Sequence, residues 1–439
     1  STLELQLTAV ALCIECRQRA TLRLLMDDGT PQSIWDSFGY FGVSRLSALV
    51  PAFRAVRKVY WSSSRSMSCK SNHLVYNDAW PSTLVYLEVR GNAQVEGGTL
   101  PPGLKTLKLK SDFDQPVAMV AFPDTVETLK FGDAFNRPVT TVKWPSRLLD
   151  LKFGDSFNQP IAGVVWPTRI RRVRFGHCFN QPVEGVAWPE GLVSITFGVS
   201  FNWPVAHVRW PNRLVRLRFY GEFDHPVDDV TWPSTLKYLH IDSRFRHPIE
   251  GVMWPDSIEE LILGYGFDSG IGGAVWPRPL KRLDLGRTFN HPIADTVWPD
   301  GMEELVIGGE FNHPINGVTW PASLKKLRIG RQFGRVTPHP TTGIPPYSTF
   351  VGKFNQSIDG VKWPSSLKVL ELGMGFNQPL NDVSWPSSIE TLSFMGDFNQ
   401  CIIGVTWPTS LRTLRFAIGF DFPVGCTLPE SVQEVVFFG

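Results

Sequence analysis

Apolar residues recur along most of the chain in short groups spaced by 22 residues. A typical group is Ile170, Val173 and Phe175, in which the last two alternate with the polar Arg172 and Arg174. Apolar side chains at every second position are typical of a short strand with one buried face. We therefore predict one strand per 22-residue unit, with Val173 and Phe175 inward and the two arginines outward.

The groups follow the pattern L-x-x-L-x-F, with other apolar residues replacing Leu or Phe in some units. They begin at Leu84, Leu104, Val126, Leu148, Ile170, Leu192, Leu214, Leu236, Ile258, Leu280, Met302, Leu324, Leu367, Ile389, Leu411 and Val432. One strand cannot bury its own apolar face, so we expect successive strands to pair in parallel and to share columns of apolar side chains. This arrangement is a mainly β repeat solenoid, about 80 Å long at ~4.8 Å per strand.

Aromatic residues and prolines keep a fixed phase relative to the strands. Phe recurs every 22 residues from Phe113 to Phe333 and again from Phe354 to Phe420, and 13 of the 16 Trp occupy one repeat position directly before a Pro, as Trp166 does. The full unit reads F-N-x-P-h-x-x-V-x-W-P-x-x-L-x-x-L-x-F-G-x-x. Two prolines per unit leave no room for a helix between strands, so we expect an extended or turn-like return path. The constant phase also predicts that the Trp side chains form a buried column.

The repeat resembles two related families. Its L-x-x-L-x-F strand, preceded by Trp-Pro-x-x-Leu, looks like a leucine-rich repeat, and Gly154 to Ile161 (Gly-Asp-Ser-Phe-Asn-Gln-Pro-Ile) closely resembles the FNIP repeat. The resemblance covers about residues 80 to 439, although the usual Leu-Pro is mostly Trp-Pro here and Phe267 to Gly270 departs from the motif. It implies a leucine-rich-repeat-like parallel-sheet horseshoe that binds proteins and has no catalytic residues.

Two parts of the chain depart from the repeat. Residues 1–75 lack its phase and show helical apolar spacing, so we predict a small helical N-terminal segment before a solenoid over residues 76–439. One interpretation of this segment is a cap over the first rung. Residues 334–353 keep near-repeat length but lose the motif, and their four prolines predict a loop, either a structural scar or a binding loop.

The alternative to a cap is a docking module. A series of residues is similar in order and approximate spacing to an F-box, a short helical module that docks to a ubiquitin-ligase adaptor: Pro31, Ile34, Trp35, Phe38, Phe41, Leu46, Leu49, Phe53 and Arg54. FNIP-type repeats do occur behind F-boxes. The usual Leu-Pro opening is Thr30-Pro31 here, and the spacer before Leu46 is short. This resemblance implies a ubiquitin-ligase substrate receptor as an alternative function.

Composition limits the partners and the compartment. The chain has 43 Lys plus Arg and 41 Asp plus Glu, so attraction to charged partners must come from local patches. No apolar run reaches the roughly 18 residues of a membrane span. The start, Ser-Thr-Leu-Glu, lacks a basic leader region, and a removed leader stays an alternative. The scattered cysteines predict free thiols and an intracellular protein of unknown compartment: Cys13, Cys16, Cys69, Cys178, Cys401 and Cys426.

Motifs for catalysis or for ligand chemistry do not emerge. The chain has no phosphate loop, HExxH, GxSxG or EF-hand pattern, and Cys13-Ile14-Glu15-Cys16 lacks a second half for zinc, so we expect no enzyme, cofactor or metal. Four histidines occupy the x of F-N-x-P, which is Gln in other units: His225, His247, His291 and His313. We predict a ladder of polar side chains bonding turn carbonyls rather than a metal site, with the Asn of Phe-Asn also bonding backbone groups.

The outward strand positions of the N-terminal half carry one sign of charge. With two further polar residues they form the predicted partner-binding surface on the concave face: Lys108, Lys130, Lys152, Arg172, Arg174, Arg216, Arg218, Tyr238 and His240. A single-sign stripe favours a protein partner with an acidic surface. The alternative is that these cations pair with local acids such as Asp150. Nucleic acid is not expected, because few aromatics besides Tyr238 interleave with the cations.

We conclude from the sequence that the chain is a non-catalytic scaffold for protein interaction. The alternatives are the ubiquitin-ligase substrate receptor and a structural or linker subunit of a large assembly, which would make contacts along edges and convex turns. The sequence does not indicate which protein binds or which oligomeric state the chain adopts.

Overall fold

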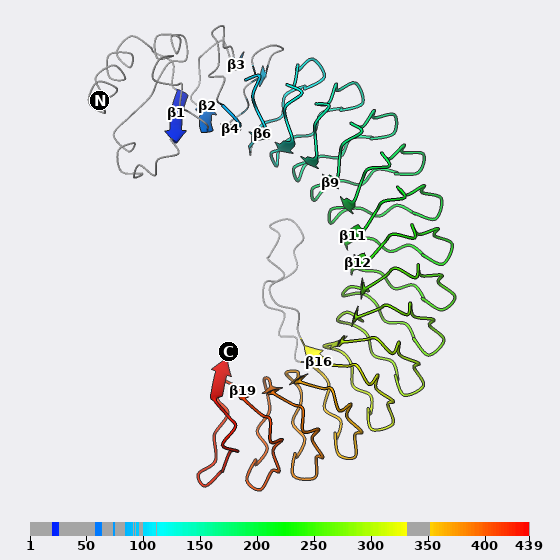
Figure 1. Cartoon of the computed structure of the whole chain (residues 1–439), viewed down its shortest axis with the longest axis vertical. Helices are drawn as coiled ribbons and strands as arrows, with labels where there is room; N and C mark the ends of the chain where they lie inside the picture. The colour runs from blue at the N-terminus through cyan, green and yellow to red at the C-terminus, as the bar shows by residue number, and fades with distance from the viewer. Residues whose placement is uncertain are drawn as a thin grey trace, which may run out of the picture. The chain divides into compact units, whose positions relative to one another are not determined.

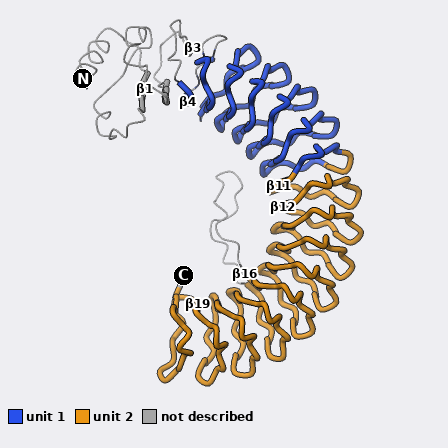
Figure 2. The backbone as a smooth tube through the Cα atoms, in the orientation of Figure 1, with its two compact units in different colours: residues 1–203, 208–214 blue, residues 204–207, 215–439 orange. Residues whose placement is uncertain are grey.

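The computed structural model describes residues 84–90, 92, 94–95, 100–110, 112–331 and 352–438, together with the backbone of strands β1 (Ala20–Leu25), β2 (Lys58–Ser63) and β3 (His73–Leu74). The chain divides into two compact units (Figure 2). Unit 1 comprises Ser1–Trp203 and Val208–Leu214, and unit 2 comprises Pro204–His207 and Val215–Gly439. Each unit is a stack of similar turns that contribute one strand apiece to a sheet (Figure 1).

The strands of unit 1 pair in parallel, each with the next along the chain. They are β4 (Tyr86–Arg90), β6 (Thr106–Leu109), β7 (Thr128–Phe131), β8 (Asp150–Lys152), β9 (Arg172–Arg174) and β10 (Ser194–Thr196). Strand β2 extends this sheet by pairing in parallel with β4, and β1 pairs antiparallel with β2. A separate two-stranded sheet joins β3 to β5 (Gln94–Val95).

Unit 2 repeats the same parallel pairing. Its strands are β11 (Arg216–Gly221), β12 (Tyr238–Ser243), β13 (Glu260–Ile262), β14 (Arg282–Asp284), β15 (Glu304–Gly308), β16 (Lys326–Arg331), β17 (Val369–Leu372), β18 (Thr391–Phe394), β19 (Thr413–Ala417) and β20 (Glu434–Phe438). Within each unit the labelled strands lie along the inner side of the curve, and the segments that connect them extend to the outer side (Figure 2). Every predicted apolar group carries a strand, so the prediction of a parallel β-solenoid is confirmed.

The core consists of columns of identical side chains. The Phe residues of the F-N-x-P motif stack from Phe113 to Phe201 with ring centroids 5.9 to 6.2 Å apart. The strand residues Phe131, Phe153 and Phe175 form a second column beside them, at 5.5 to 5.7 Å. Nearly all Trp of the Trp-Pro motif from Trp166 to Trp407 are buried, apart from two half-buried copies, which confirms the predicted Trp column.

Glycine ends most strands because the next turn lies against the backbone there. A Cβ built on Gly154 would lie 1.7 Å from the carbonyl oxygen of Gly132, and one on Gly176 would lie 2.0 Å from that of Gly154. Only a residue without a side chain permits this approach. The Gly after the strand is therefore a packing requirement of the stack.

The turns are joined by a ladder of Asn side chains. The amide N–H of Asn180 donates to Oδ1 of Asn158 at 2.9 Å, and that of Asn158 donates to Oδ1 of Asn136 at 3.0 Å. The next position adds a second bond: Gln181 Nε2 donates to the Asn158 carbonyl oxygen at 3.2 Å, and His313 Nε2 lies 3.0 Å from that of Asn290. These contacts confirm the predicted ladder of polar side chains that bond backbone groups.

The sheet passes directly from β16 to β17, although 43 residues rather than 22 separate paired positions there. Leu327 pairs with Leu370, and the amide N–H of Asn355 donates to Oδ1 of Asn312 at 3.0 Å. Both ladders therefore continue across the interruption of the repeat. Residues 334–351 of the predicted loop lie outside the described residues, so neither interpretation of it is tested.

The N-terminal segment differs from its prediction where the structure describes it. Ala20–Leu25, which we included in a helical pattern, is strand β1, and the described residues contain no helix. The alternation of Leu22 and Leu24 with Thr21 and Arg23 suits a strand paired along one edge. Strands β2 and β3 also lie within residues 1–75. The other residues of the predicted helical segment, including the F-box-like series from Pro31 to Arg54 and the Cys13-Ile14-Glu15-Cys16 pair, lie outside the described residues.

Candidate protein-binding surface

Four cations stand in register on neighbouring strands of unit 1. Strand pairing places Lys108 beside Lys130, Lys130 beside Lys152, and Lys152 beside Arg174. All four alternate with buried core residues, so they share the side of the sheet that faces away from the core. Hydrogen-bonded strands lie about 4.8 Å apart, which sets the spacing of these residues. We call Lys108, Lys130, Lys152 and Arg174 the basic column.

A buried acid adjoins one end of the basic column. Glu88 of β4 pairs in register with Lys108, and its Oε2 accepts a hydrogen bond from the Tyr86 hydroxyl at 2.8 Å. The ammonium nitrogen of Lys108 lies 5.0 Å from the centroid of the Tyr86 ring, in a cation–π contact. The Tyr86 ring is thus already occupied by a cation of the chain itself.

Asp150 partly neutralises the positive charge at the other end of the basic column, beside Arg174. Its Oδ2 lies 3.1 Å from Nε of Arg172 and 3.8 Å from Nη2 of Arg174. The alternative in which local acids pair with the cations therefore applies to these two arginines. Lys130 and Lys152 form no ion pair among the described residues, so the middle of the basic column keeps its positive charge.

The positive charge of the column acts on its own members. Partial burial lowers the pKa of the Lys130 ammonium most, and the cations Lys108, Arg174 and Lys152 lower it further, against an opposing effect of Asp150. Like charges held on adjacent strands disfavour one another's charged forms. A ligand that brings negative charge to this column would relieve that repulsion.

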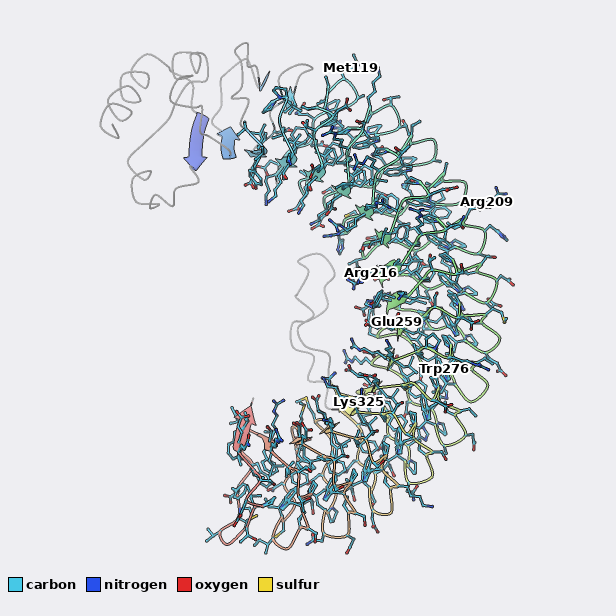
Figure 3. The ribbon with its side chains drawn as sticks, in the orientation of Figure 1. Met119, Arg209, Arg216, Glu259, Trp276 and Lys325 are labelled. Atoms are coloured by element: carbon cyan, nitrogen blue, oxygen red, sulfur yellow. The ribbon has the colours of Figure 1, made fainter. Side chains whose placement is uncertain are left out.

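The remaining predicted site residues belong to unit 2 and are engaged within it. The guanidinium of Arg216, which points to the inner side of the curve in Figure 3, lies 4.5 Å from the ring centroid of Tyr238. His240 is only 9% exposed, and its Nε2 lies 2.6 Å from Oε1 of Glu260. Arg218 is half-buried. The structure therefore offers less free cationic surface here than the sequence predicted.

The side of the unit 2 sheet that faces away from the core carries an ion-pair network instead of a single sign of charge. Arg282 lies 3.8 Å from a carboxylate oxygen of Glu260 on one side and of Glu304 on the other. Arg328 in turn contacts Glu304 and donates its Nε–H to Oε2 of Glu371 at 2.8 Å. Acids and cations therefore alternate from strand to strand, and this face is largely compensated from within.

Asp284 lies inside this network and is 2% exposed. Burial raises its pKa to about 7, although the Gly286 amide N–H, which donates to Oδ1 at 2.9 Å, and the nearby Arg282 both lower it. The negative charges of Asp242 and Glu304 raise it further. The sequence does not single out Asp284, because its burial depends on neighbours one turn away in the chain.

The outer side of the turns shows a different surface. The residue between the core Val (Ala or Thr in some turns) and the Trp is exposed, and in three consecutive turns of unit 2 it is apolar: Met253, Val275 and Val297, which are 74 to 80% exposed. We call these three residues the apolar column. In unit 1 the same position carries exposed cations at Lys143 and at Arg209, which points outward in Figure 3, with the exposed Val165 between them in the chain. The sequence analysis did not single out this position.

Within the described ranges, no group of three or more His, Cys, Asp or Glu side chains could hold a metal ion. A helix with the length and hydropathy of a membrane span is absent from the part of the chain that the structure describes. Cys178, Cys401 and Cys426 are free thiols.

The stacked turns, the parallel sheet and the L-x-x-L-x-F strands define a leucine-rich-repeat-like β-solenoid. The family model described as FNIP Repeat matches residues 92–134, 223–266, 289–332, 354–397 and 376–418. The chain therefore carries FNIP repeats, which confirms the resemblance seen in the sequence.

Several solved structures are similar to this chain. The circular LRR protein CroV588 is 26% identical over 82% of this chain and 67% of its own, with a TM-score of 0.48. An internalin (InlF) of Listeria monocytogenes is 11% identical over 78% of this chain and 87% of its own, with a TM-score of 0.46. The Drosophila Toll–Spätzle complex includes a chain 13% identical over 76% of this chain and 44% of its own, with a TM-score of 0.47. A comparison with curated proteins finds no match.

Proposed function

We propose that this protein is a non-catalytic interaction scaffold that binds an acidic surface of a partner protein at the basic column. The observation that carries the proposal is that Lys130 and Lys152 stand in register on adjacent strands and form no ion pair among the described residues. The FNIP repeats and the leucine-rich-repeat-like fold support it, since repeat solenoids present extended binding surfaces.

The electrostatics favour a carboxylate-bearing partner. A protein that brings carboxylates to the basic column gains attraction and also relieves the repulsion among its cations. The contact should weaken with salt, because exposed charges are screened over about 10 Å at 0.1 M ionic strength. Stacking of nucleic acid bases has little support, because the Tyr86 ring already contacts Lys108.

The proposal places the centre of binding in unit 1. Arg172 and Arg174 remain about half exposed beside Asp150 and would contribute at the edge of the contact. Arg216, Arg218, Tyr238 and His240 are assigned a lesser part, because Arg216 contacts Tyr238 and His240 contacts Glu260.

The test compares two charge reversals of equal size in the full-length chain. One variant carries Lys130→Glu and Lys152→Glu in the basic column, and the matched control carries Lys143→Glu and Arg209→Glu on the outer side of the turns. Proteins captured from a cell extract by the parent, identified by cross-linking and mass spectrometry, should be acidic, should elute with salt and should be lost from the column variant alone. Equal retention by both variants, in folded proteins, would overturn the proposal.

A second candidate function is a structural subunit of an assembly, and the apolar column favours it. Met253, Val275 and Val297 form an exposed apolar strip on the outer side of consecutive turns, where such a subunit would make contacts. Sedimentation velocity of the parent and of the Met253→Ser, Val275→Ser, Val297→Ser variant would test it. A parent that sediments as a monomer up to high concentration, and that captures no partner which the triple variant loses, would argue against this function.

A further inference from the structure

We infer that the acidic element bound at the basic column is an α-helix of the partner, which lies across strands β6 to β9 and presents one carboxylate per turn. The inference rests on the proposed function, because it names the shape of the partner that the same surface accepts. It follows from the spacing of the column, from the low surface beside it and from the charges at its two ends.

Spacing is the first argument. The cations stand on successive strands, so they recur about every 4.8 Å along a line that crosses the strands. Side chains at i and i+3 or i+4 of an α-helix recur at about 5.4 Å, the pitch of the helix. Over the three intervals from Lys108 to Arg174 the two spacings differ by about 2 Å in total, which flexible Lys side chains can absorb.

An extended segment matches the column less well. Residues on one face of a strand recur every second position, or about 6.6 to 6.8 Å. Over the same three intervals the mismatch reaches about 6 Å, so the outer carboxylates would miss their cations. A helix therefore satisfies all four cations at once, whereas a strand satisfies two or three.

The surface beside the basic column has room for a helix. Over β6 and β7 the neighbouring outward line of residues carries the short, half-buried side chains of Thr106 and Thr128, which pair with each other in register. Over β8 and β9 the same line carries the ion pair of Asp150 and Arg172. Their methyl and hydroxyl groups form a low shelf next to Lys108 and Lys130. A helix that directs a carboxylate at each Lys would rest small residues on this shelf, because residues three and four apart share a face.

The charges at the ends of the column indicate the direction of the helix. Arg172 and Arg174 lie together on β9, and cations stabilise the C-terminal end of a helix, where the partial charge is negative. Glu88 occupies the column position on β4 and suits the N-terminal end. We therefore place the N-terminus of the bound helix over β4 and β6 and its C-terminus over β9.

The test measures binding of labelled synthetic peptides to the full-length chain by fluorescence anisotropy. The first peptide is an Ala-rich helix of about 16 residues with Glu at i, i+4, i+7 and i+11. A second has the same composition with its Glu residues spread around the helix, and a third is Pro-interrupted with Glu at alternate positions. A short DNA duplex serves as a polyanion of a different class.

We expect the striped helix to bind at least about tenfold more tightly than the other three probes at 0.1 M salt. Lys130→Glu with Lys152→Glu should abolish its binding, whereas Lys143→Glu with Arg209→Glu should leave it unchanged. Lys130→Gln with Lys152→Gln removes both charges without reversing them and should weaken binding by an intermediate factor, which keeps the test valid if the reversed variant folds poorly.

The outcomes separate the helix from the proposed function. If the alternate-position peptide binds more tightly than the striped helix, or if all acidic peptides bind equally, and the column variant abolishes that binding, the helix is overturned while the acidic-partner function stands. Tighter binding of the DNA duplex, or binding that survives in the column variant, overturns both. A bound helix that a spin label at its N-terminus locates over β9 overturns the assigned direction.

Discussion

Arg328 on β16 donates its Nε–H to the carboxylate of Glu371 on β17 at 2.8 Å, although 43 residues separate the two in the chain. The two side chains are 14% and 8% exposed, and Arg328 also contacts Glu304. Replacement of Arg328 by Ala removes the cation that donates to the buried Glu371 carboxylate, so we expect Arg328→Ala to lower the free energy of unfolding by about 3 to 5 kcal/mol. Urea denaturation followed by circular dichroism measures this.

The control for that variant is an exposed ion pair in the same turn. Lys325 Nζ lies 3.0 Å from Oε2 of Glu303, and both side chains are largely in solvent. Exposed pairs contribute less than about 1 kcal/mol, so Lys325→Ala should shift the urea midpoint only slightly. Equal shifts for the two variants would show that the Arg328 network has no special role.

Trp210 and Trp203 provide a matched pair for the core. Trp210 is 7% exposed and packs edge-on against Phe197 at 6.3 Å, whereas Trp203 is 40% exposed. Removal of a buried indole leaves a cavity, so Trp210→Ala should cost about 3 to 5 kcal/mol in unfolding free energy. Trp203→Ala loses a hydrogen bond to Asn180 and should cost about 1 kcal/mol. Thermal melts that do not distinguish the two variants would contradict the buried column.

The Asn ladder makes a separate contribution to stability. Oδ1 of Asn158 accepts hydrogen bonds from the Asn180 amide at 2.9 Å and from Gln181 Nε2 at 3.0 Å. We expect Asn158→Ala to destabilise the chain by about 1 to 2 kcal/mol and to speed hydrogen exchange of the Asn180 amide. Asn316→Ala, at an exposed position in a turn, is the control and should change stability by less than about 0.5 kcal/mol. Unchanged exchange at Asn180 would argue against the ladder.

Asp284 predicts a pH dependence. Its folded pKa of about 7 lies above the usual value of 3.8, so the folded chain binds a proton that the unfolded chain releases. The unfolding free energy should therefore fall by a few kcal/mol as the pH rises from about 4 to about 7. Asp284→Asn removes this loss, so the variant should be more stable than the parent at pH 8 and similar to it at pH 4.

The comparison needs a control for the loss of one carboxylate. Asp295→Asn, at an exposed position of a turn, serves this purpose. Urea midpoints for the parent and both variants across this pH range test whether the protonation of Asp284 causes the pH dependence. A constant difference between Asp284→Asn and the parent at every pH would refute the protonation of Asp284.

The strands and the core could be predicted because they repeat. Apolar residues equivalent to Ile170, Val173 and Phe175 recur in nearly every turn. Each packs on the equivalent residue of the next turn, so its burial follows from the repeat alone. The basic column followed from the same logic, and the structure places its four cations in register. Its role in binding stays a prediction.

The ion pairs could not be predicted in this way, because they depend on residues that differ between turns. The distances from Glu260 to His240 and to Arg282 depend on side-chain geometry across the sheet. Arg328 contacts Glu371 only because the sheet continues across the interruption of the repeat. Strand β1 was missed for a related reason, since the apolar spacing near Ala20 suits both a helix and a strand.

The bond between Asn355 and Asn312 spans 43 residues, yet it has the same form as the bonds that span 22. Each turn therefore bonds to the preceding turn through the same Asn hydrogen bond, whatever the length of chain between the two. Recombination between similar coding segments can then add or remove whole turns, and the Asn hydrogen bonds form again between the turns that become neighbours. The length of the array is thus a heritable variable, and lineages can change the reach of the scaffold without evolving a new fold.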